Sequence, residues 1–99
     1  MSGILRALGL CRKAGALVCG TPMICAALPS GELCAVYEAA DTSEGTHKKL
    51  TDKCEYYKIK HMRLTCGGER LADALGKSSF LAAVAVTDEK MSMMVEKYI

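Results

Sequence analysis

Hydrophobic and polar positions along the chain divide it into short periodic segments, of which 33–57 is the most informative. Its first part, 33–40, is mostly apolar and has the length of a buried strand. After a polar turn, Leu50, Cys54 and Tyr57 recur at i, i+4 and i+7, and charged residues occupy the other positions. A strand that leads into an amphipathic helix is half of a βαβ unit, so the pattern predicts a sheet with helices packed on it.

Two helix starts are indicated by polar residues before the periodic segments. Asp41 and Glu44 have the spacing of a capping box, which predicts that Asp41 caps the helix of the central segment. Thr21 and Pro22 suit the cap and first helical position of an earlier helix, because proline lacks only an N–H that would be unpaired there.

The remaining elements follow from the same periodicities. In chain order we expect a helix over 4–13, a strand over 16–19, a helix over 21–28, a strand over 59–64, a helix over 71–75, a strand over 80–86 and a helix that starts at Thr87 or Asp88 and buries Met91, Met94, Val95 and Tyr98. The strand 59–64 has polar residues on both faces, as at a sheet edge, whereas 80–86 is apolar throughout, as in a strand buried on both faces. This alternation predicts an α/β sandwich.

Composition narrows the function classes. The chain has 99 residues, which suits a single domain over 1–99, and its apolar and charged fractions are those of an ordinary globular domain. The formal net charge is only +2, so an anionic partner would have to meet a local basic patch. Since no apolar run approaches the about 20 residues of a membrane span, and no signal peptide is recognisable, we expect a cytoplasmic protein.

The sequence gives little indication of disulfides, a metal site or enzymatic activity. The six cysteines lie at irregular intervals within apolar segments, which favours reduced core residues over disulfides. His47 and His61 look isolated, so no metal site is expected. Cys66, before a Gly-Gly turn, is the one cysteine whose context permits a reactive thiol. No nucleotide-binding or hydrolase motif occurs, and we expect no enzymatic activity.

Four stretches keep a characteristic order and spacing over nearly the whole chain. They are LGLCRKAGALVCG (Leu8–Gly20), AADTSEGTHKKLTDKCEYY (Ala39–Tyr57), LADALGK (Leu71–Lys77) and AVAVTD (Ala83–Asp88). Together they resemble the L7Ae/L30e ribosomal-protein family, in particular its small bacterial L7Ae-like (YlxQ-type) branch. The resemblance implies a three-layer α/β/α sandwich around a four-stranded mixed sheet, and it implies RNA binding.

The resemblance also points to the start of the second helix as the place where RNA is read. Archaeal and eukaryotic members of the family bind kink-turn RNA there through a Gly-x-Asn-Glu-x-x-Lys motif, and the matching stretch here is 20–26. Gly20 is kept, but Pro22 and Met23 replace the asparagine and glutamate, and Ala26 replaces the lysine. Apolar side chains cannot hydrogen-bond base edges, so the sequence argues against the family's usual kink-turn readout.

Backbone contacts remain available at this end of the fold. The second helix offers N–H groups to a phosphate, and the segment after Gly76 corresponds to the family's other RNA-facing loop. The candidate RNA-binding residues are Arg12, Lys13, Gly20, Thr21, Lys77, Ser78 and Ser79. Structural roles are also open, because Thr21 can simply start a helix and the two consecutive cations can offset a helix dipole.

The sequence and the resemblance together predict a small, non-enzymatic RNA-binding protein, whose expected partners are structured RNA, either ribosomal or kink-turn-like, and ribosomal proteins. No cofactor, metal or membrane is expected. The alternative is a protein-interaction module that keeps the fold without RNA readout, which the apolar Pro22-Met23 pair and the low net charge favour. Salt separates the two, because phosphate contacts weaken steeply as salt rises and a hydrophobic interface does not.

Overall fold

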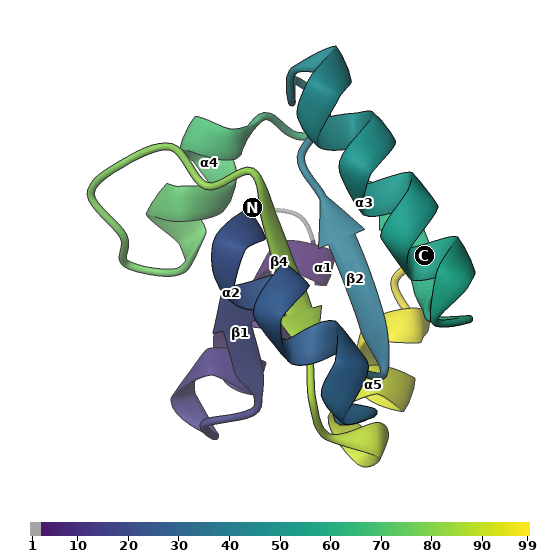
Figure 1. Ribbon diagram of the computed structural model, residues 1–99. Helices are drawn as coiled ribbons and strands as arrows, with labels where there is room; N and C mark the ends of the chain where they lie inside the picture. Colours follow the sequence, from purple (N-terminus) through teal and green to yellow (C-terminus); the bar gives the residue numbers. More distant parts are fainter. Residues whose placement is uncertain (1–2) are drawn as a thin grey trace.

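The computed structural model describes residues 3–99, and Figure 1 shows its helices packed around a central sheet. In chain order its elements are α1 (Gly3–Lys13), β1 (Leu17–Cys19), α2 (Thr21–Ala27), the 3-10 turn η1 (Leu28–Ser30), β2 (Ala35–Glu38), α3 (Glu44–Tyr56), β3 (Lys60–Arg63), α4 (Gly68–Ala74), β4 (Ala83–Val86) and α5 (Glu89–Glu96). None of these helices has the length and apolar character needed to cross a bilayer.

The strands form one mixed sheet in the order β1-β4-β2-β3. β4 pairs antiparallel with both β1 and β2, and β2 pairs parallel with β3. β3 is an edge strand, as its polar residues on both faces predicted, and β2 and β4 are central and fully buried. The predicted buried strand over 80–86 is shorter than expected, because Phe80 is half exposed and only Ala83–Val86 pair.

Helices cover both faces of the sheet, so the α/β/α sandwich expected from the resemblance is confirmed (Figure 1). α1, α4 and α5 pack on the face that carries Tyr37 and Val84. α2 and α3 pack on the face that carries Val36 and Ala85. The last helix buries Val95 as predicted, but Tyr98 is 55% exposed and lies outside that core. Two separate cores therefore hold the sheet between its helices.

The start of α3 differs from the predicted capping box. Ser43 is the cap, and its hydroxyl accepts a hydrogen bond from the Thr46 N–H. The Asp41 carboxylate instead accepts from the Gly68 N–H at the start of α4. Because the Asp41 carboxylate is hydrogen-bonded to α4, it does not cap α3, and α3 begins at Glu44.

The start of α2 also differs from the prediction. Gly20 occupies the cap position, Thr21 is already helical, and no side chain caps the helix. Gly20 has a φ of 94° and a ψ of 142°, a backbone conformation that side chains with a Cβ rarely adopt. The glycine thus allows the sharp turn that joins β1 to α2.

Two glycine-to-alanine substitutions should therefore have opposite effects on stability. We expect Gly20→Ala to lower the free energy of unfolding by about 1–3 kcal/mol, because alanine is strained at this φ. Gly45→Ala, in the first turn of α3 with no atom within 4 Å of the added Cβ, should raise it by roughly 0.5–1 kcal/mol. Urea unfolding of both variants measures these changes, and a neutral Gly20→Ala would show that the turn relaxes without cost.

Candidate nucleic-acid interface

Two segments distant in sequence meet at one end of the sheet. The Gly20 N–H donates to the Ala83 carbonyl at 2.9 Å, and Cys19 pairs with Val84 in the β1–β4 ladder. The start of α2 therefore lies beside the end of the loop 77–82 that leads into β4.

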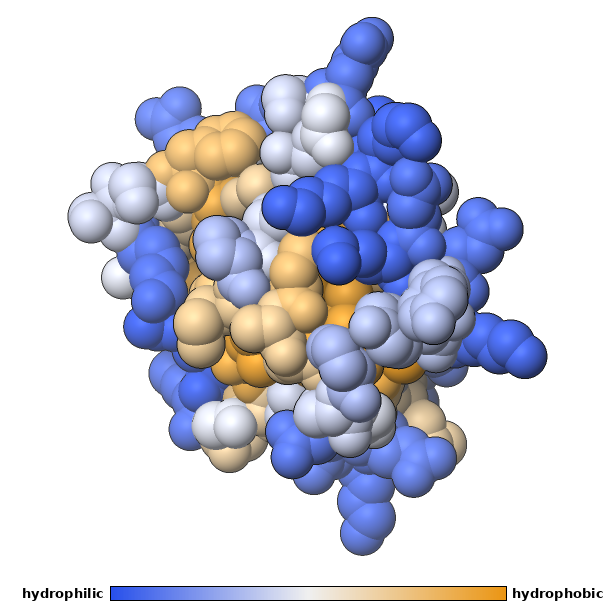
Figure 2. All heavy atoms as spheres, viewed as in Figure 1, coloured by the Kyte–Doolittle hydropathy of each residue, from blue (hydrophilic) through white to orange (hydrophobic). Residues whose placement is uncertain are grey.

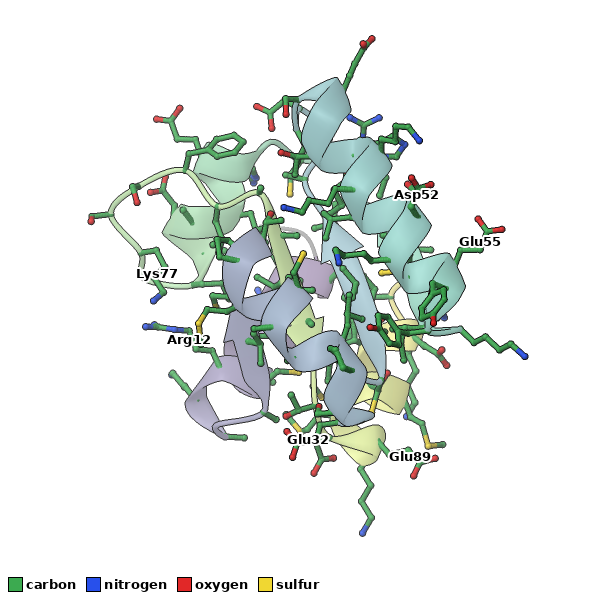
Figure 3. All side chains as sticks on the ribbon, in the orientation of Figure 1. Arg12, Glu32, Asp52, Glu55, Lys77 and Glu89 are labelled. Atoms are coloured by element: carbon green, nitrogen blue, oxygen red, sulfur yellow. The ribbon has the colours of Figure 1, made fainter. Side chains whose placement is uncertain are left out.

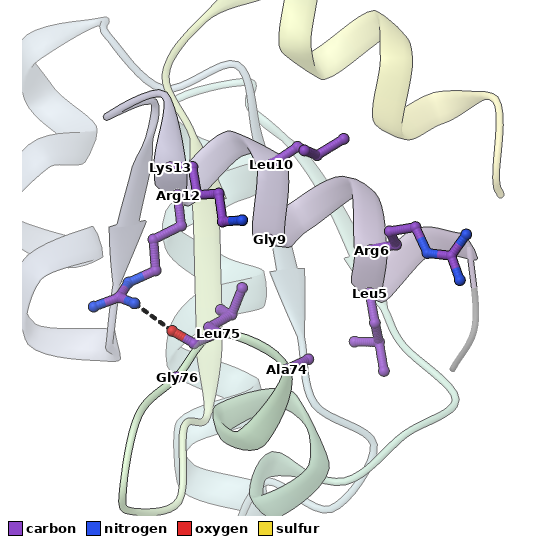
Figure 4. Close-up of a pocket in the computed structure, with 9 residues that line it drawn as sticks. All are labelled: Leu5, Arg6, Gly9, Leu10, Arg12, Lys13, Ala74, Leu75 and Gly76. Carbon is purple, nitrogen blue, oxygen red and sulfur yellow. Dashed lines mark hydrogen bonds between the residues drawn. The ribbon is translucent and has the colours of Figure 1, made fainter.

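Arg12 ties the last turn of α1 to this loop. Its guanidinium donates to the Leu75 carbonyl at the end of α4, and a Cβ on Gly76 would lie 3.4 Å from its Nη1 (Figure 4). Gly76 has a φ of 72°, which lets the chain leave α4 close to the guanidinium. The arginine is thereby held over the start of the loop that contains Lys77.

Arg12 and Lys77 both lie near the partly buried thiol of Cys19. Burial raises the pKa of the Cys19 thiol above its ordinary value, and the positive charges of Lys77 and Arg12 oppose that rise. Figure 3 shows both side chains on the same side of the molecule, away from the labelled acidic residues. We call Arg12 and Lys77 the cation pair.

Lys13 lines a groove between α1 and α4 (Figure 4). The groove has a volume of about 520 Å³ and is lined by Leu5, Arg6, Gly9, Leu10, Arg12, Lys13, Ala74, Leu75 and Gly76 (Figure 4). Three of its side chains are cationic and none is acidic, so it extends the positive surface of the cation pair along α1.

The other predicted site residues have different surroundings. Ser78 and Ser79 line a smaller cavity of about 210 Å³ together with Glu69 and Asp73, whose carboxylates disfavour a phosphate there. The Thr21 hydroxyl oxygen is buried and has no hydrogen-bond partner among residues 3–99. Arg12 thus lies at the start of the loop that contains Lys77, Gly20 lies beside its end, and the two serines between them face acidic side chains.

Large apolar side chains are exposed on α2 and in the loop before β4. Met23 on α2 is 63% exposed and Phe80 in the loop before β4 is 52% exposed. Figure 2 shows apolar residues gathered over α2 on this face, with hydrophilic side chains along α3. A Cβ on Gly68 would clash with the Phe80 ring, so this glycine makes room for the aromatic side chain at the start of α4.

A second polar cluster was missed in the sequence. Glu38 is fully buried at the end of β2, and its carboxylate contacts His47 Nδ1 at 2.9 Å and His61 Nε2 at 2.8 Å. The interpretation of the two histidines as isolated is therefore wrong. Thr42 donates to the same carboxylate, and Arg63 Nε lies 3.7 Å from it. We call Glu38, His47 and His61 the Glu-His cluster.

Opposing effects set the ionisation of Glu38. Burial raises the pKa of its carboxyl group, but hydrogen bonds from Thr42, His47 and His61 together outweigh burial and hold the pKa below its ordinary value. Glu38 is therefore a carboxylate at neutral pH. A glutamate inside the apolar run 35–39 was the available signal, because a buried charge requires partners.

Known proteins resemble this chain in sequence and in fold. The RNA-binding protein YlxQ of Bacillus subtilis (strain 168) is 33% identical over 82 residues, which cover 83% of this chain and 80% of the relative. The RNA-binding protein YlxQ of Enterococcus faecium is 33% identical over 70 residues, 71% of this chain and 67% of the relative.

Two solved structures share the fold. A protein of unknown function from Bacillus halodurans C superposes with a TM-score of 0.90 at 28% identity and covers 99% of this chain and 97% of its own. The Giardia lamblia 15.5kD RNA binding protein superposes with a TM-score of 0.77 at 16% identity, covering 95% of this chain and 82% of its own. At that identity the second likeness concerns the fold alone.

The family itself follows from a match that spans nearly every element described above. The profile of the ribosomal protein L7Ae/L30e/S12e/Gadd45 family matches residues 3–96, from the start of α1 to the end of α5. The chain belongs to the ribosomal protein L7Ae/L30e/S12e/Gadd45 family.

Proposed function

We propose that this protein is a small, non-enzymatic RNA-binding protein that docks on the backbone of a bent, structured RNA. We expect it to bind ribosomal RNA and kink-turn-like RNA in the cytoplasm. The family and the two relatives named for RNA binding support this proposal. The observation that carries it is the cation pair, in which Arg12 is bonded to the Leu75 carbonyl at the start of the loop that contains Lys77.

The cation pair supplies the kind of contact that an RNA backbone requires. Arg12 is held in place by its hydrogen bond to the Leu75 carbonyl, whereas Lys77 is exposed in the adjacent loop. Two positive charges at one end of a compact fold neutralise neighbouring phosphates and release their counterions. Arg6 and Lys13 along the groove on α1 lengthen this surface.

Base readout contributes little in this proposal. Met23 takes the position of the family's glutamate and is 63% exposed, so it offers RNA an apolar surface and no hydrogen bond. Phe80, half exposed in the loop before β4, offers a ring on which an unpaired base can stack. Discrimination among RNAs then depends on their shape and their unpaired bases.

The experiment is a titration of the reduced protein with a kink-turn RNA, an unbent duplex and total ribosomal RNA between about 50 and 200 mM salt. We expect salt-sensitive binding to all three RNAs. Lys77→Gln should weaken binding to each by about tenfold near 100 mM salt and reduce the salt slope by about one, because one phosphate contact is lost.

Lys49→Gln is the matched control, because Lys49 is an exposed lysine on α3, outside the cation pair and the groove. Its affinity and salt slope should equal those of the wild type. Absence of binding to all three RNAs at the lower salt concentration contradicts the proposal. Equal losses in Lys77→Gln and Lys49→Gln would show that the charge of the whole surface, and not this site, attracts RNA.

The exposed apolar side chains support a second candidate, a protein-interaction module on the same fold. Met23 and Phe80 expose apolar surface of 63% and 52% of their area, and the net charge is only +2. If no RNA binds, a protein partner held by Met23 becomes the favoured function. Met23→Glu should then abolish that complex, whereas added salt should leave it intact.

A further inference from the structure

We propose that the Glu-His cluster is a binding site for a divalent transition-metal ion of the zinc type. The site is separate from the cation pair, and the inference does not rest on RNA binding. It is carried by three ligand groups from three different elements, namely Glu38 of β2, His47 of α3 and His61 of β3, whose ligand atoms all lie within 4.8 Å of one another.

The position of the ligand atoms fits a shared ion. His47 Nδ1 and His61 Nε2 both contact Oε1 of Glu38, at 2.9 and 2.8 Å. Zinc bonds to imidazole nitrogen and carboxylate oxygen are about 2.0–2.2 Å, which places neighbouring tetrahedral ligands about 3.3 Å apart. For an ion to replace the two protons, each ring needs to withdraw from Glu38 by about 0.5 Å. The two ring nitrogens, which lie within 4.8 Å of each other, need to be about 3.3 Å apart as well.

The ligand types favour zinc and related ions over magnesium or calcium. Two imidazoles and one carboxylate form a set that Zn²⁺ accepts, whereas Mg²⁺ and Ca²⁺ prefer oxygen ligands throughout. Three protein ligands leave one tetrahedral position for water. Since the His47 side chain is 41% exposed, both the ion and that water have access from solvent.

Further contacts orient the carboxylate. Oε2 of Glu38 accepts from the Thr42 hydroxyl and lies 3.7 Å from Arg63 Nε. These contacts to Oε2 hold the carboxylate in one orientation, as hydrogen bonds from residues around the ligands do in known metal sites. Arg63, whose side chain is 42% exposed, brings a positive charge that weakens the site relative to one without it.

The buried thiol near the cluster is a poor competing ligand. Burial, with smaller contributions from Cys25 and Glu38, raises the pKa of the Cys54 thiol to about 11. A thiol must lose its proton to bind zinc, and the raised pKa makes that loss more costly at Cys54 than at an ordinary cysteine. The other cysteines have to be distinguished from the cluster by the experiment.

The test is a titration of chelator-treated, reduced full-length protein with Zn²⁺ by calorimetry and with Co²⁺ by absorption. We expect one ion per chain and a Co²⁺ spectrum of a nitrogen- and oxygen-ligated ion without thiolate charge-transfer absorption. His47→Gln and His61→Gln should each weaken Zn²⁺ binding by at least about tenfold. Lys49→Gln, on the same helix as His47, should bind as the wild type does.

Nuclear magnetic resonance of the imidazole nitrogens provides an independent readout, because the chain contains only two histidines. Zn²⁺ should shift the signals of both rings in the wild type. If the ring signals do not change at saturating Zn²⁺, or if Zn²⁺ does not bind, the cluster is only a hydrogen-bonded network and the proposal is overturned. Undiminished binding in both histidine variants, with thiolate absorption from Co²⁺, would place the ion on cysteines and also overturn it.

Discussion

The Glu38→Ala protein should unfold with a free energy about 3 kcal/mol below that of the wild type. The substitution removes a fully buried carboxylate and the acceptor for Thr42, His47 and His61. Hydrogen bonds to a charged group contribute more than neutral ones, and the donors left behind lose their partner. Because His47 is partly exposed, water reaches it after the substitution, which holds the loss near the lower end of the range for broken buried pairs.

Glu55→Ala is the matched control for this prediction, since Glu55 is an exposed glutamate on α3. Its free energy of unfolding should differ from that of the wild type by less than about 0.5 kcal/mol. Both proteins are measured by urea unfolding with a chelator present, so that bound metal does not contribute to the difference. A loss below about 1 kcal/mol in Glu38→Ala would mean that the cost of burying the carboxylate cancels its hydrogen bonds.

The second large effect is expected in the core beneath α1. Leu8 is completely buried among residues of α1, α4, α5 and the sheet, so Leu8→Ala should lower the free energy of unfolding by about 2–5 kcal/mol. The loss combines the transfer free energy of the removed methyl groups with the cavity left in a close-packed core. Thermal or urea unfolding measures it.

Leu10→Ala, on the same helix, separates burial from helix propensity. Leu10 is 48% exposed at the groove, and its replacement should change the free energy of unfolding by about 0.5 kcal/mol or less. Both variants carry the same chemical change in the same helix. Equal losses would show that the groove side of α1 is as well packed as its core side.

Local patterns predicted most of the fold because most of its elements have their own periodicity. The central strand–helix segment and the edge strand β3 lie close to their predicted places, and β4 occupies the last four residues of its predicted strand. The helix caps were less predictable, because a cap depends on which other element needs the same polar group. Asp41 has the sequence spacing of a cap for α3, but α4 is close enough in space to take its carboxylate.

The candidate interface was only partly accessible from sequence. The resemblance placed Gly20 and the loop after Gly76 at the same end of the fold, and the hydrogen bond from Gly20 to Ala83 is consistent with that placement. The acidic surroundings of Ser78 and Ser79 depend on how α4 turns its Glu69 and Asp73 toward the loop. No linear motif contains that information.

The Glu-His cluster could not be predicted from sequence spacing. Its three residues belong to different elements, and parallel pairing of β2 with β3 sets Val36 beside His61 and so brings that histidine near Glu38. His47 reaches the same carboxylate from α3, which packs across this face. The spacing of the three residues in the sequence does not predict that they are in contact. A glutamate in a buried strand does predict a polar partner, because a buried charge is unfavourable without one.

The position of β4 constrains how the chain acquires its structure during synthesis. β4 is the last strand to be made, yet it lies between β1 and β2 and supplies ladder bonds to both. Until residue 86 is available, Leu17–Cys19 has no strand partner and Ala35–Glu38 has only β3. The growing polypeptide therefore cannot join β1 to the rest of its sheet until residue 86 has emerged, and apolar strands stay exposed until then.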